Sequence, residues 1–280
     1  MKKKEQGRMS KRIRYLAKPT HYVAAAILLL IIFCALFANV LAPYDPLKQD
    51  LLVTLKAPSA EHWFGTDQLG RDILSRVIYG SRVSLLVCLA SVLIAGIIGV
   101  IIGVMAGYFG GVFDLIVCAL IDTQMAIPFF VLALTLASIF DPSLWSVIII
   151  LSITSWPRYA RMARSQALTL KSMDYVKAAV SMGASSKWVL FRHIVPNVMG
   201  IISTLATTEA ARMILLESAL SFIGMGVPAD SSSWGLLTSD GRAVLSTAWW
   251  VATIPGIAIF VTCASITILG DFARRVLKME

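Results

Sequence analysis

Charged side chains within long apolar stretches are the residues of this sequence best placed to act on a solute. Asp122, Glu209, Arg212 and Glu217 each interrupt a mainly apolar run. Charged groups at bilayer depth are costly, so such residues face protein or water. Glu209 and Arg212 stand three positions apart and can pair on a helix. Two interpretations stay open: structural charges, or a polar lining for a charged or zwitterionic solute.

The two aspartates of the third apolar run are expected to differ. Asp114 stands at the start of the run and is predicted to lie at the membrane interface. Asp122 stands deeper in the run, where an isolated charge is disfavoured. We therefore expect Asp122 to be buried and partnered.

Motifs for catalysis or metal binding are absent from the sequence. No Gly-x-x-x-x-Gly-Lys-Ser/Thr occurs, so no phosphate cradle for ATP is predicted. The three histidines are scattered, and neither His-Glu-x-x-His nor Gly-x-Ser-x-Gly is present. The four cysteines lie in apolar runs without a CxxC spacing and are expected to be packing residues. We expect no catalytic residue, no metal site and no cofactor in this chain, and a membrane enzyme is a weak hypothesis.

Composition places the chain in a membrane. Hydrophobic residues make up 58% of the 280 positions, against about 45–50% in soluble domains. They are concentrated in runs of about 20 residues, the length of a membrane-crossing helix. The sequence therefore predicts an all-α integral membrane protein. The net charge of +9 is not interpreted as nucleic-acid binding, because the basic residues segregate by loop.

The apolar runs predict six transmembrane helices, with glycine, proline and charged residues at the breaks. They cover residues 22–42, 83–107, 113–138, 144–164, 197–224 and 249–270. The first run is longer than the hydrophobic part of a signal peptide, so an uncleaved span is expected. The predicted organisation is a basic tail (1–21), a first helix (22–42), an outer loop (43–82), a core of five helices (83–270) and a C-terminal tail (271–280).

The distribution of Lys and Arg predicts the orientation of the chain. With the N-terminus inside, the segments 2–18, 158–196 and 271–280 hold 18 basic residues, and the outer segments 43–82 and 225–248 hold six. Basic residues gather in cytoplasmic loops. Both termini are therefore predicted to be cytoplasmic.

Two further patterns concern helix packing. Residues 65–80 are amphipathic, with capping residues at Thr66 or Asp67 and a glycine stop at Gly80, and predict a short helix in the membrane interface. A contact for an external protein is the alternative. Gly99, Gly103 and Gly107 share one helix face and allow close approach of another helix, in this chain or in a partner.

The longest inner loop carries a helical insert. Arg158, Arg161 and Arg164 extend the fourth span and are interpreted as interface anchors. Residues 174–182 predict a short helix that Gly183 ends. Ser185 or Ser186 can cap a second helix, which Pro196 is expected to end. An ordinary surface hairpin and a docking site for a partner both fit this spacing.

The insert resembles the "EAA" loop of binding-protein-dependent ABC importer permeases. Ala178, Ala179, Gly183 and Pro196 match that pattern, whereas Lys177 replaces its Glu. Further blocks are similar to C-type subunits of the dipeptide/oligopeptide/nickel permease family, and the resemblance covers nearly the whole chain. These blocks are Phe64–Arg76, Gly183–Ser185 with Arg192–Asn197, and Glu217–Val227 with Trp234-Gly235.

The resemblance implies a type I ABC importer permease fold with a cytoplasmic coupling helix in the loop 165–196, in the bacterial inner membrane. It implies a second, homologous permease subunit as a heterodimer partner, two ATPase subunits that bind ATP-Mg, and an external solute-binding protein. The implied ATPase-docking residues are Tyr175, Ala178, Ala179, Met182, Gly183 and Ala184.

Substrate class is the least specified part of the prediction. The resemblance allows peptides, nickel or metal chelates. Peptides are favoured because Glu209, Arg212 and Glu217 suit a zwitterion, and no His/Cys cluster indicates bare metal. A self-sufficient secondary transporter or channel is the alternative from another class, although it would need no docking hairpin.

Overall fold

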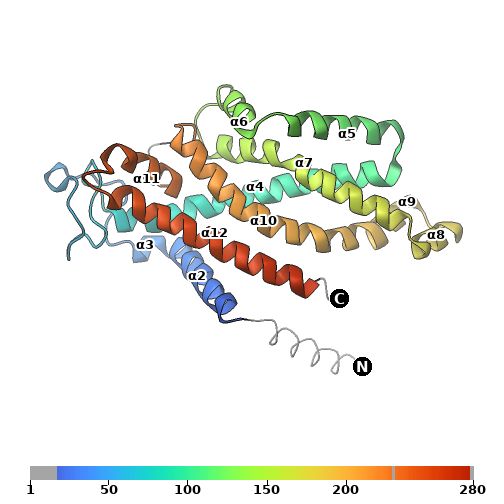
Figure 1. Ribbon diagram of the computed structural model, residues 1–280, viewed down its shortest axis with the longest axis horizontal. Coiled ribbons are helices and arrows are strands. Elements are labelled where there is room, and N and C mark those ends of the chain that lie inside the picture. The colour runs from blue at the N-terminus through green and yellow to red at the C-terminus, as the bar shows by residue number, and fades with distance from the viewer. Residues whose placement is uncertain (1–17, 229–230, 278–280) are drawn as a thin grey trace. The chain divides into compact units, whose positions relative to one another are not determined.

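The computed structural model describes residues 18–228 and 231–277, and the chain folds into helices (Figure 1). No β-strand occurs in these two ranges; Thr66 and Asp72 form one isolated antiparallel bridge. The chain divides into two compact units. The first contains residues 18–88, 142–144 and 210–277, and the second contains residues 89–141 and 145–209. Most of the predicted basic tail (1–21) and the last three residues of the C-terminal tail lie outside the described residues.

The first unit combines the two ends of the described chain. Its helices are α2 (Pro19–Leu36), α3 (Ala38–Leu41), α11 (Trp234–Gly241) and α12 (Trp250–Leu277), with short 3-10 turns at Leu51–Val53 and Arg242–Val244. Helix α12 packs against both α2 and α11. Near the end of this contact the rings of His21 and Phe272 lie 4.8 Å apart.

The second unit carries the inserted loop. It contains α5 (Gly111–Ala126), α6 (Phe129–Ala137), α7 (Leu144–Lys171), α8 (Asp174–Ser181) and α9 (Ser186–Val189), with a π-helical turn at Leu190–Ile194. Two long helices, α4 (Ile73–Phe109) and α10 (Val195–Phe222), contribute a part to each unit. The core of the second unit gathers residues of α4, α7, α8, α9 and α10 around Tyr159, Ala163 and Val198.

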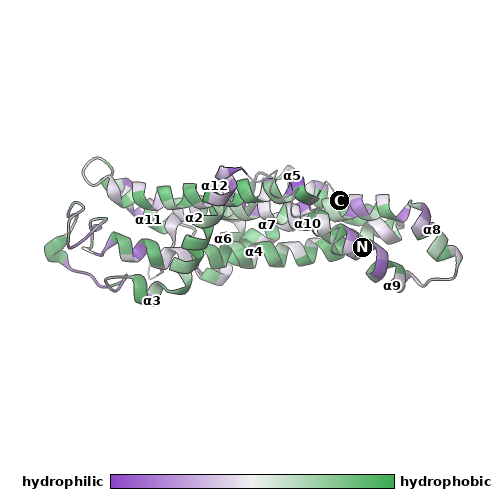
Figure 2. Ribbon diagram, turned by 90° about the horizontal axis from the view of Figure 1, so that it is seen from below, coloured by the Kyte–Doolittle hydropathy of each residue, from purple (hydrophilic) through white to green (hydrophobic). Residues whose placement is uncertain are grey.

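Four helical stretches are long and apolar enough to cross a membrane: Pro19–Leu36, Ile73–Phe109, Ser186–Phe222 and Trp250–Val276. The bent pair α5 and α6 raises the number to five if it forms one span. The hydropathy view shows hydrophobic residues prevailing along α2, α4 and α12 (Figure 2). Helix α7, which covers the predicted fourth span, is not among the stretches that qualify. The predicted count of six spans is therefore not confirmed.

The predicted interfacial helix over 65–80 differs from the structure. Residues 65–72 form a loop, and α4 begins at Ile73 and continues unbroken to Phe109. Asp72 caps this start, because its Oδ2 accepts the Ser75 N–H at 2.8 Å. Gly80 lies within α4 and allows close packing: a Cβ there would come within 2.8 Å of the Trp234 ring.

Two prolines also shape the helices in unexpected ways. The predicted third span (113–138) is broken between α5 and α6, which meet at 94°, because Pro128 disfavours a helical conformation at Ile127. Pro196, predicted to end a helix, is instead the second residue of α10. The helical stretch Ser186–Phe222 passes this proline directly after the π-helical turn, where the backbone hydrogen bonds depart from the α-helical pattern.

The glycine stripe of α4 packs against α7 of the same unit. A Cβ at Gly99 would lie 2.5 Å from the Tyr159 Cβ, and one at Gly103 would overlap the Ala160 carbonyl. One at Gly107 would lie 2.6 Å from the Arg164 oxygen. The stripe therefore serves close helix packing within this chain.

Candidate functional site: a docking hairpin and polar groups within the helices

The hairpin formed by α8 and α9 has a defined turn. Gly183 has a φ of 88°, and its N–H donates to the Val180 carbonyl at 2.9 Å. The Ala184 N–H donates to the Ala179 carbonyl at 3.0 Å. Together these bonds form a Schellman motif, which ends α8 at the glycine. Ser185 then caps α9 by accepting the Trp188 N–H at 3.3 Å, as the sequence predicted.

One side of the hairpin is anchored in the second unit. Val176 and Ala179 of α8 are buried, as are Val189 and Ile194 after the turn. Val176, Val189 and Ile194 join a hydrophobic cluster that includes Tyr108 of α4 and Leu170 of α7. The short helices are therefore held by packing against long ones, not by their own helical propensity.

The opposite side of the hairpin is exposed and apolar. Met182 is 82% exposed, and Tyr175 and Val180 are also exposed. A hollow of about 500 Å³ opens here, lined by Ala179, Met182, Gly183, Ala184, Ser185 and Trp188. Four predicted docking residues line this hollow. The other two, Tyr175 and Ala178, are exposed on α8.

Sequence reasoning missed the aromatic group beside this hollow. The His193 ring lies 4.9 Å from the Trp188 ring and 5.6 Å from the Tyr175 ring, edge-on in both cases. These contacts join α8, α9 and the π-helical turn. The Ser185 cap, three positions earlier, predicts that Trp188 lies on the first turn of the second helix. It does not predict the contact of Trp188 with His193.

The three arginines of α7 form a row of ion pairs, which the sequence analysis did not predict. Arg158 Nη1 lies 3.4 Å from the Glu209 carboxylate of α10. Arg161 and Arg164 each reach α5: the Arg161–Asp122 and Arg164–Asp114 pairs both measure 2.5 Å. These pairs could not be predicted from the sequence of α7, because the carboxylate partners lie far away in the sequence. The interpretation of these arginines as interface anchors stays a prediction, and the structure adds a carboxylate partner for each of them.

Exposure distinguishes these pairs. The Asp114 and Arg164 side chains are 17% and 29% exposed. The Asp122 and Arg161 side chains are 70% and 51% exposed. The prediction that Asp122 is buried is thus wrong, although its partner is real. A charge at the centre of a membrane helix is disfavoured by about 2.5–3.5 kcal/mol even on the most permissive scale, so the exposed pair indicates a face that meets water or protein.

Two of the remaining pathway candidates, Glu209 and Glu217, are buried, and Arg212 is half-buried. Glu209 is 3% exposed. Glu217 is fully buried and accepts hydrogen bonds from Ser221 at 3.0 Å and Ser84 at 3.5 Å. The predicted pairing of Glu209 with Arg212 stays a prediction.

A buried charge cluster in the first unit joins the outer loop to α11. The Asp67 Oδ2 lies 2.6 Å from Arg71 Nε and 2.5 Å from Arg76 Nη1. Arg76, whose side chain is fully buried, also reaches Asp240 at 3.3 Å. The polar face of the predicted 65–80 helix is therefore buried in ion pairs, and it does not lie toward lipid headgroups.

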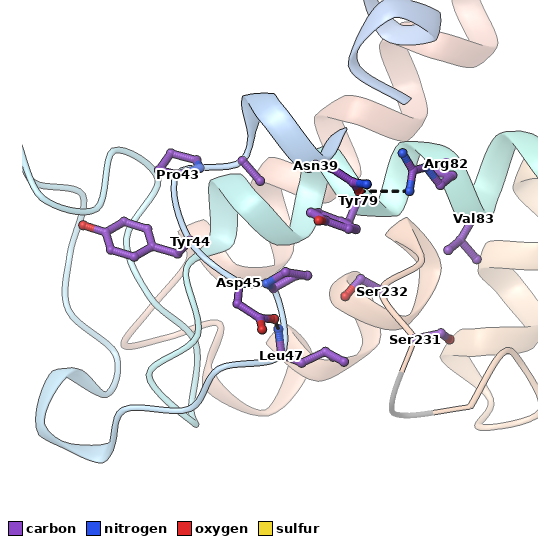
Figure 3. A pocket seen from close by; sticks show the side chains of 12 residues that line it. Asn39, Pro43, Tyr44, Asp45, Leu47, Tyr79, Arg82, Val83, Ser231 and Ser232 are labelled. Carbon is purple, nitrogen blue, oxygen red and sulfur yellow. Dashed lines mark hydrogen bonds between the residues drawn. The ribbon is translucent and has the colours of Figure 1, made fainter. Parts of the chain in front are cut away.

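A pocket of about 550 Å³ opens in the first unit beside this loop. Figure 3 shows its lining from the segment after α3, the start of α4 and the segment before α11. Arg82 donates to the Ala35 and Leu36 carbonyls and to Asn39 Oδ1. The guanidinium thus satisfies the free carbonyls at the end of α2, which gives it a structural role.

The described residues hold no group of three or more potential metal ligands. All four cysteines are free. Helices of membrane-crossing length, a helical hairpin with an exposed apolar face, and ion pairs between the helices together define a helical membrane protein with a surface that suits a partner.

Comparison with known proteins identifies the family. Residues 99–278 match the binding-protein-dependent transport system inner membrane component, and residues 11–58 match the N-terminal TM domain of oligopeptide transport permease C. The chain belongs to this family of ABC importer permeases. Membership implies ATPase and binding-protein partners, and the family is a transport component, not an ATPase.

Several curated relatives cover almost the whole chain. The probable D,D-dipeptide transport system permease protein DdpC of Escherichia coli K12 is 38% identical over 92% of this chain and 87% of its own length. The di/tripeptide permease DppC of Pseudomonas aeruginosa is 38% identical over 88% of this chain and 84% of its own length. The oligopeptide permease OppC of Bacillus subtilis is 37% identical over 94% of this chain and 86% of its own length.

Solved structures support the fold. An inward-facing MetNI methionine ABC transporter structure matches with a TM-score of 0.62 at 18% identity, covering 73% of this chain and 97% of that chain. An amino acid ABC transporter crystallised with histidines matches with a TM-score of 0.56 at 19% identity. The match covers 72% of this chain and 94% of that chain. The fold class predicted from the sequence, an ABC importer permease fold, is confirmed.

Proposed function

We propose that this chain is a permease subunit of an ATP-driven peptide importer in the bacterial inner membrane, with both termini cytoplasmic. The observation that carries the proposal is the agreement among relatives. Proteins named for D,D-dipeptide, di/tripeptide and oligopeptide transport are 37–38% identical to the chain over about nine-tenths of its length.

The proposed assembly has four kinds of subunit. A second, homologous permease forms a heterodimer with this chain, and the two line the pathway between them. Two cytoplasmic ATPase subunits bind and hydrolyse ATP-Mg, and an external binding protein delivers the solute. This chain itself carries no catalytic residue, cofactor or metal.

The exposed side of the α8–α9 hairpin is the proposed ATPase-docking surface. Its residues are Tyr175, Ala178, Met182, Gly183 and Ala184, together with Ala179, which is buried but lines the hollow. Exposed Met182 and Tyr175 supply apolar area, and the adjacent hollow can receive a side chain of the partner. Closure of the ATPase pair moves this surface, and the long helices that anchor it shift between inward-facing and outward-facing states. Such coupling requires the ATPase to bind the two states differently.

Asp122, Glu209, Arg212 and Glu217 are proposed to contribute to the pathway. In the chain as described, Asp122 is accessible, whereas Glu209 and Glu217 are enclosed. The enclosed carboxylates would reach a solute only when the helices rearrange. We therefore assign the direct role to Asp122, and to Glu209 and Glu217 a role in stabilising one state.

A nickel or metal-chelate importer of the same architecture is the second candidate, and a self-sufficient secondary transporter is the third. The exposed docking hairpin favours an ATP-driven importer over a self-sufficient secondary transporter, which needs no docking surface for an ATPase. The test is purification of the tagged chain from its native membrane in mild detergent, with mass spectrometry of associated proteins. Uptake of peptide and of nickel is then measured in liposomes that contain the purified complex and the binding protein.

Two ATPases and a second permease in the preparation, with peptide uptake that requires ATP, are the expected results. Uptake of nickel but not peptide would assign the second candidate. A chain recovered alone that transports without ATP would overturn the proposal.

A further inference from the structure

The Asp122–Arg161 ion pair is the most exposed charged contact on the long helices of the second unit. Its oxygen and nitrogen lie 2.5 Å apart, yet the two side chains remain 70% and 51% exposed. A pair that only fastens two helices can be enclosed by them. This one leaves much of both charged groups open to whatever covers the α5–α7 face.

The depth of the pair follows from two helices counted separately. The residues from Gly111, where α5 begins, to Asp122 span about 17 Å at 1.5 Å per residue. Those from Arg161 to Lys171, where α7 ends, span about 15 Å. The two ends lie close together, since Lys171 Nζ donates to the Tyr108 carbonyl at 2.6 Å. Both counts place the pair about 15–17 Å from that end of the two helices.

The exposed residues of α5 before Asp122 are apolar. Val112, Leu115 and Leu120 are 74%, 70% and 56% exposed. The neighbourhood of the pair is polar by contrast: Gln124 Nε2 donates to the Ile153 carbonyl at 2.5 Å, and Gln124 Oε1 accepts the Trp156 Nε1–H at 3.0 Å. The polar groups therefore form a local patch around Asp122, because the next large exposed residues, Met125 and Ile127, are apolar again.

The neighbouring pair offers a matched comparison on the same two helices. Asp114 and Arg164 form a two-bonded contact of 2.5 and 2.7 Å, with 17% and 29% of the side chains exposed. Residue types and contact distance agree between the two pairs, and exposure differs. The Asp114–Arg164 pair thus has the enclosure expected of a structural fastening.

We propose that Asp122 and Arg161 lie on the solute pathway and hold the two charged ends of a zwitterionic solute. The Asp122 carboxylate would accept hydrogen bonds from a solute ammonium group, and the Arg161 guanidinium would donate to a solute carboxylate. The two side chains neutralise each other when no solute is present. The ion pair opens and closes without any covalent step. This assignment rests on the proposed function, because it requires a peptide-like cargo.

Accessibility of the α5 face is the first test. In a chain whose Cys34, Cys88, Cys118 and Cys263 are replaced by serine, Ala119→Cys places a thiol one helical turn from Asp122. Leu120→Cys places one on the opposite flank of α5. In the assembled complex, a water-soluble, membrane-impermeant thiol reagent should modify Ala119→Cys at least tenfold faster than Leu120→Cys, and excess dipeptide should slow it. Equal rates at the two positions, or no effect of dipeptide, would overturn the pathway assignment.

Uptake by charge-neutral variants is the second test. Asp122→Asn and Arg161→Gln should each lower ATP-dependent dipeptide uptake per complex about tenfold, as expected for loss of one charge-assisted bond. The double variant leaves no unpaired charge, so it would recover if the pair were only structural; we expect it to stay defective. The double variant Asp114→Asn/Arg164→Gln should lower the yield of complex but keep the uptake of each complex near wild type.

The two proposals fail in different ways. If the wild-type complex and the Asp122 and Arg161 variants import dipeptide equally well, the role proposed for the pair is wrong and the proposed function stands. Wild-type complex that imports no peptide would overturn both.

Discussion

Gly183 occupies a backbone conformation, φ 88°, that residues with a Cβ adopt only with strain. A Cβ there would meet no atom within 4 Å, so space is not the constraint. Gly183→Val should cost about 1–2 kcal/mol in the turn and loosen the α8–α9 hairpin. We expect uncoupling: loss of peptide uptake with ATPase activity retained and with normal membrane insertion, measured on the purified complex.

Gly183→Asn is the matched control for this substitution. Asparagine tolerates the left-handed region better than valine and adds its side chain to the same open space. It should keep most of the uptake. Wild-type uptake by a well-expressed Gly183→Val variant would contradict the coupling role of the turn.

Asp67 is the residue on which the buried cluster of the first unit depends. It pairs with both Arg71 and Arg76, and Arg76 is fully buried. Asp67→Asn leaves buried positive charge with less compensation, which should lower the free energy of unfolding by about 3–5 kcal/mol. The melting temperature of the detergent-solubilised chain would fall. Asp174→Asn, which removes a fully exposed carboxylate 3.9 Å from Lys177, should leave the melting temperature unchanged. An equal fall in melting temperature for both variants would contradict the role of Asp67 in the buried cluster.

Local signals at single residues were predictable from the sequence, and distant partners were not. The glycine stop at Gly183 and the serine cap at Ser185 depend on neighbours within five positions, and both are confirmed. The carboxylate partners of Arg158, Arg161 and Arg164 lie 39 to 51 positions away. The charge pattern of one helix contains no information about which helix lies beside it.

At the scale of elements, the glycine stripe sets the distance between α4 and α7. A Cβ at Gly103 would lie 2.9 Å from the Ala160 Cα, in addition to overlapping the carbonyl. Gly103→Ala should therefore push the helices apart and cost about 1–3 kcal/mol. Gly200→Ala in α10 is the control, because a Cβ there meets nothing within 4 Å. Thermal unfolding in detergent should show a lower midpoint for the first variant only; equal midpoints would contradict the packing role.

The elements that the sequence misplaced lie at glycine and proline residues. Gly80 and Pro196 are typical helix-ending residues, and each lies inside or at the start of a longer helix. A Cβ at Gly80 would meet the Trp234 ring, and Pro196 follows the π-helical turn within the continuous stretch Ser186–Phe222. The break at Pro128 was missed because hydropathy stays high on both sides of it. Tertiary contacts and backbone geometry decided these cases, and neither is visible to a hydropathy pattern.

At the scale of the whole molecule, α7 decides the number of spans. Four stretches qualify by length and composition, the α5–α6 pair makes five, and α7 would make six. Its apolar first half is followed by Arg158, Arg161 and Arg164. Those charges lower its hydropathy, but their carboxylate partners neutralise them. We therefore predict that α7 crosses the membrane.

Single cysteines in the serine-substituted chain test this crossing. Ile139 precedes α7 and is 71% exposed, and Met182 follows it and is 82% exposed. The excess of basic residues on the N-terminal side predicts that Ile139→Cys is labelled from outside intact cells, as Leu52→Cys in the outer loop should be. Met182→Cys should react only after the cells are opened. If Ile139→Cys and Met182→Cys react from the same side, α7 does not cross, the spans number five, and the two termini lie on opposite sides of the membrane.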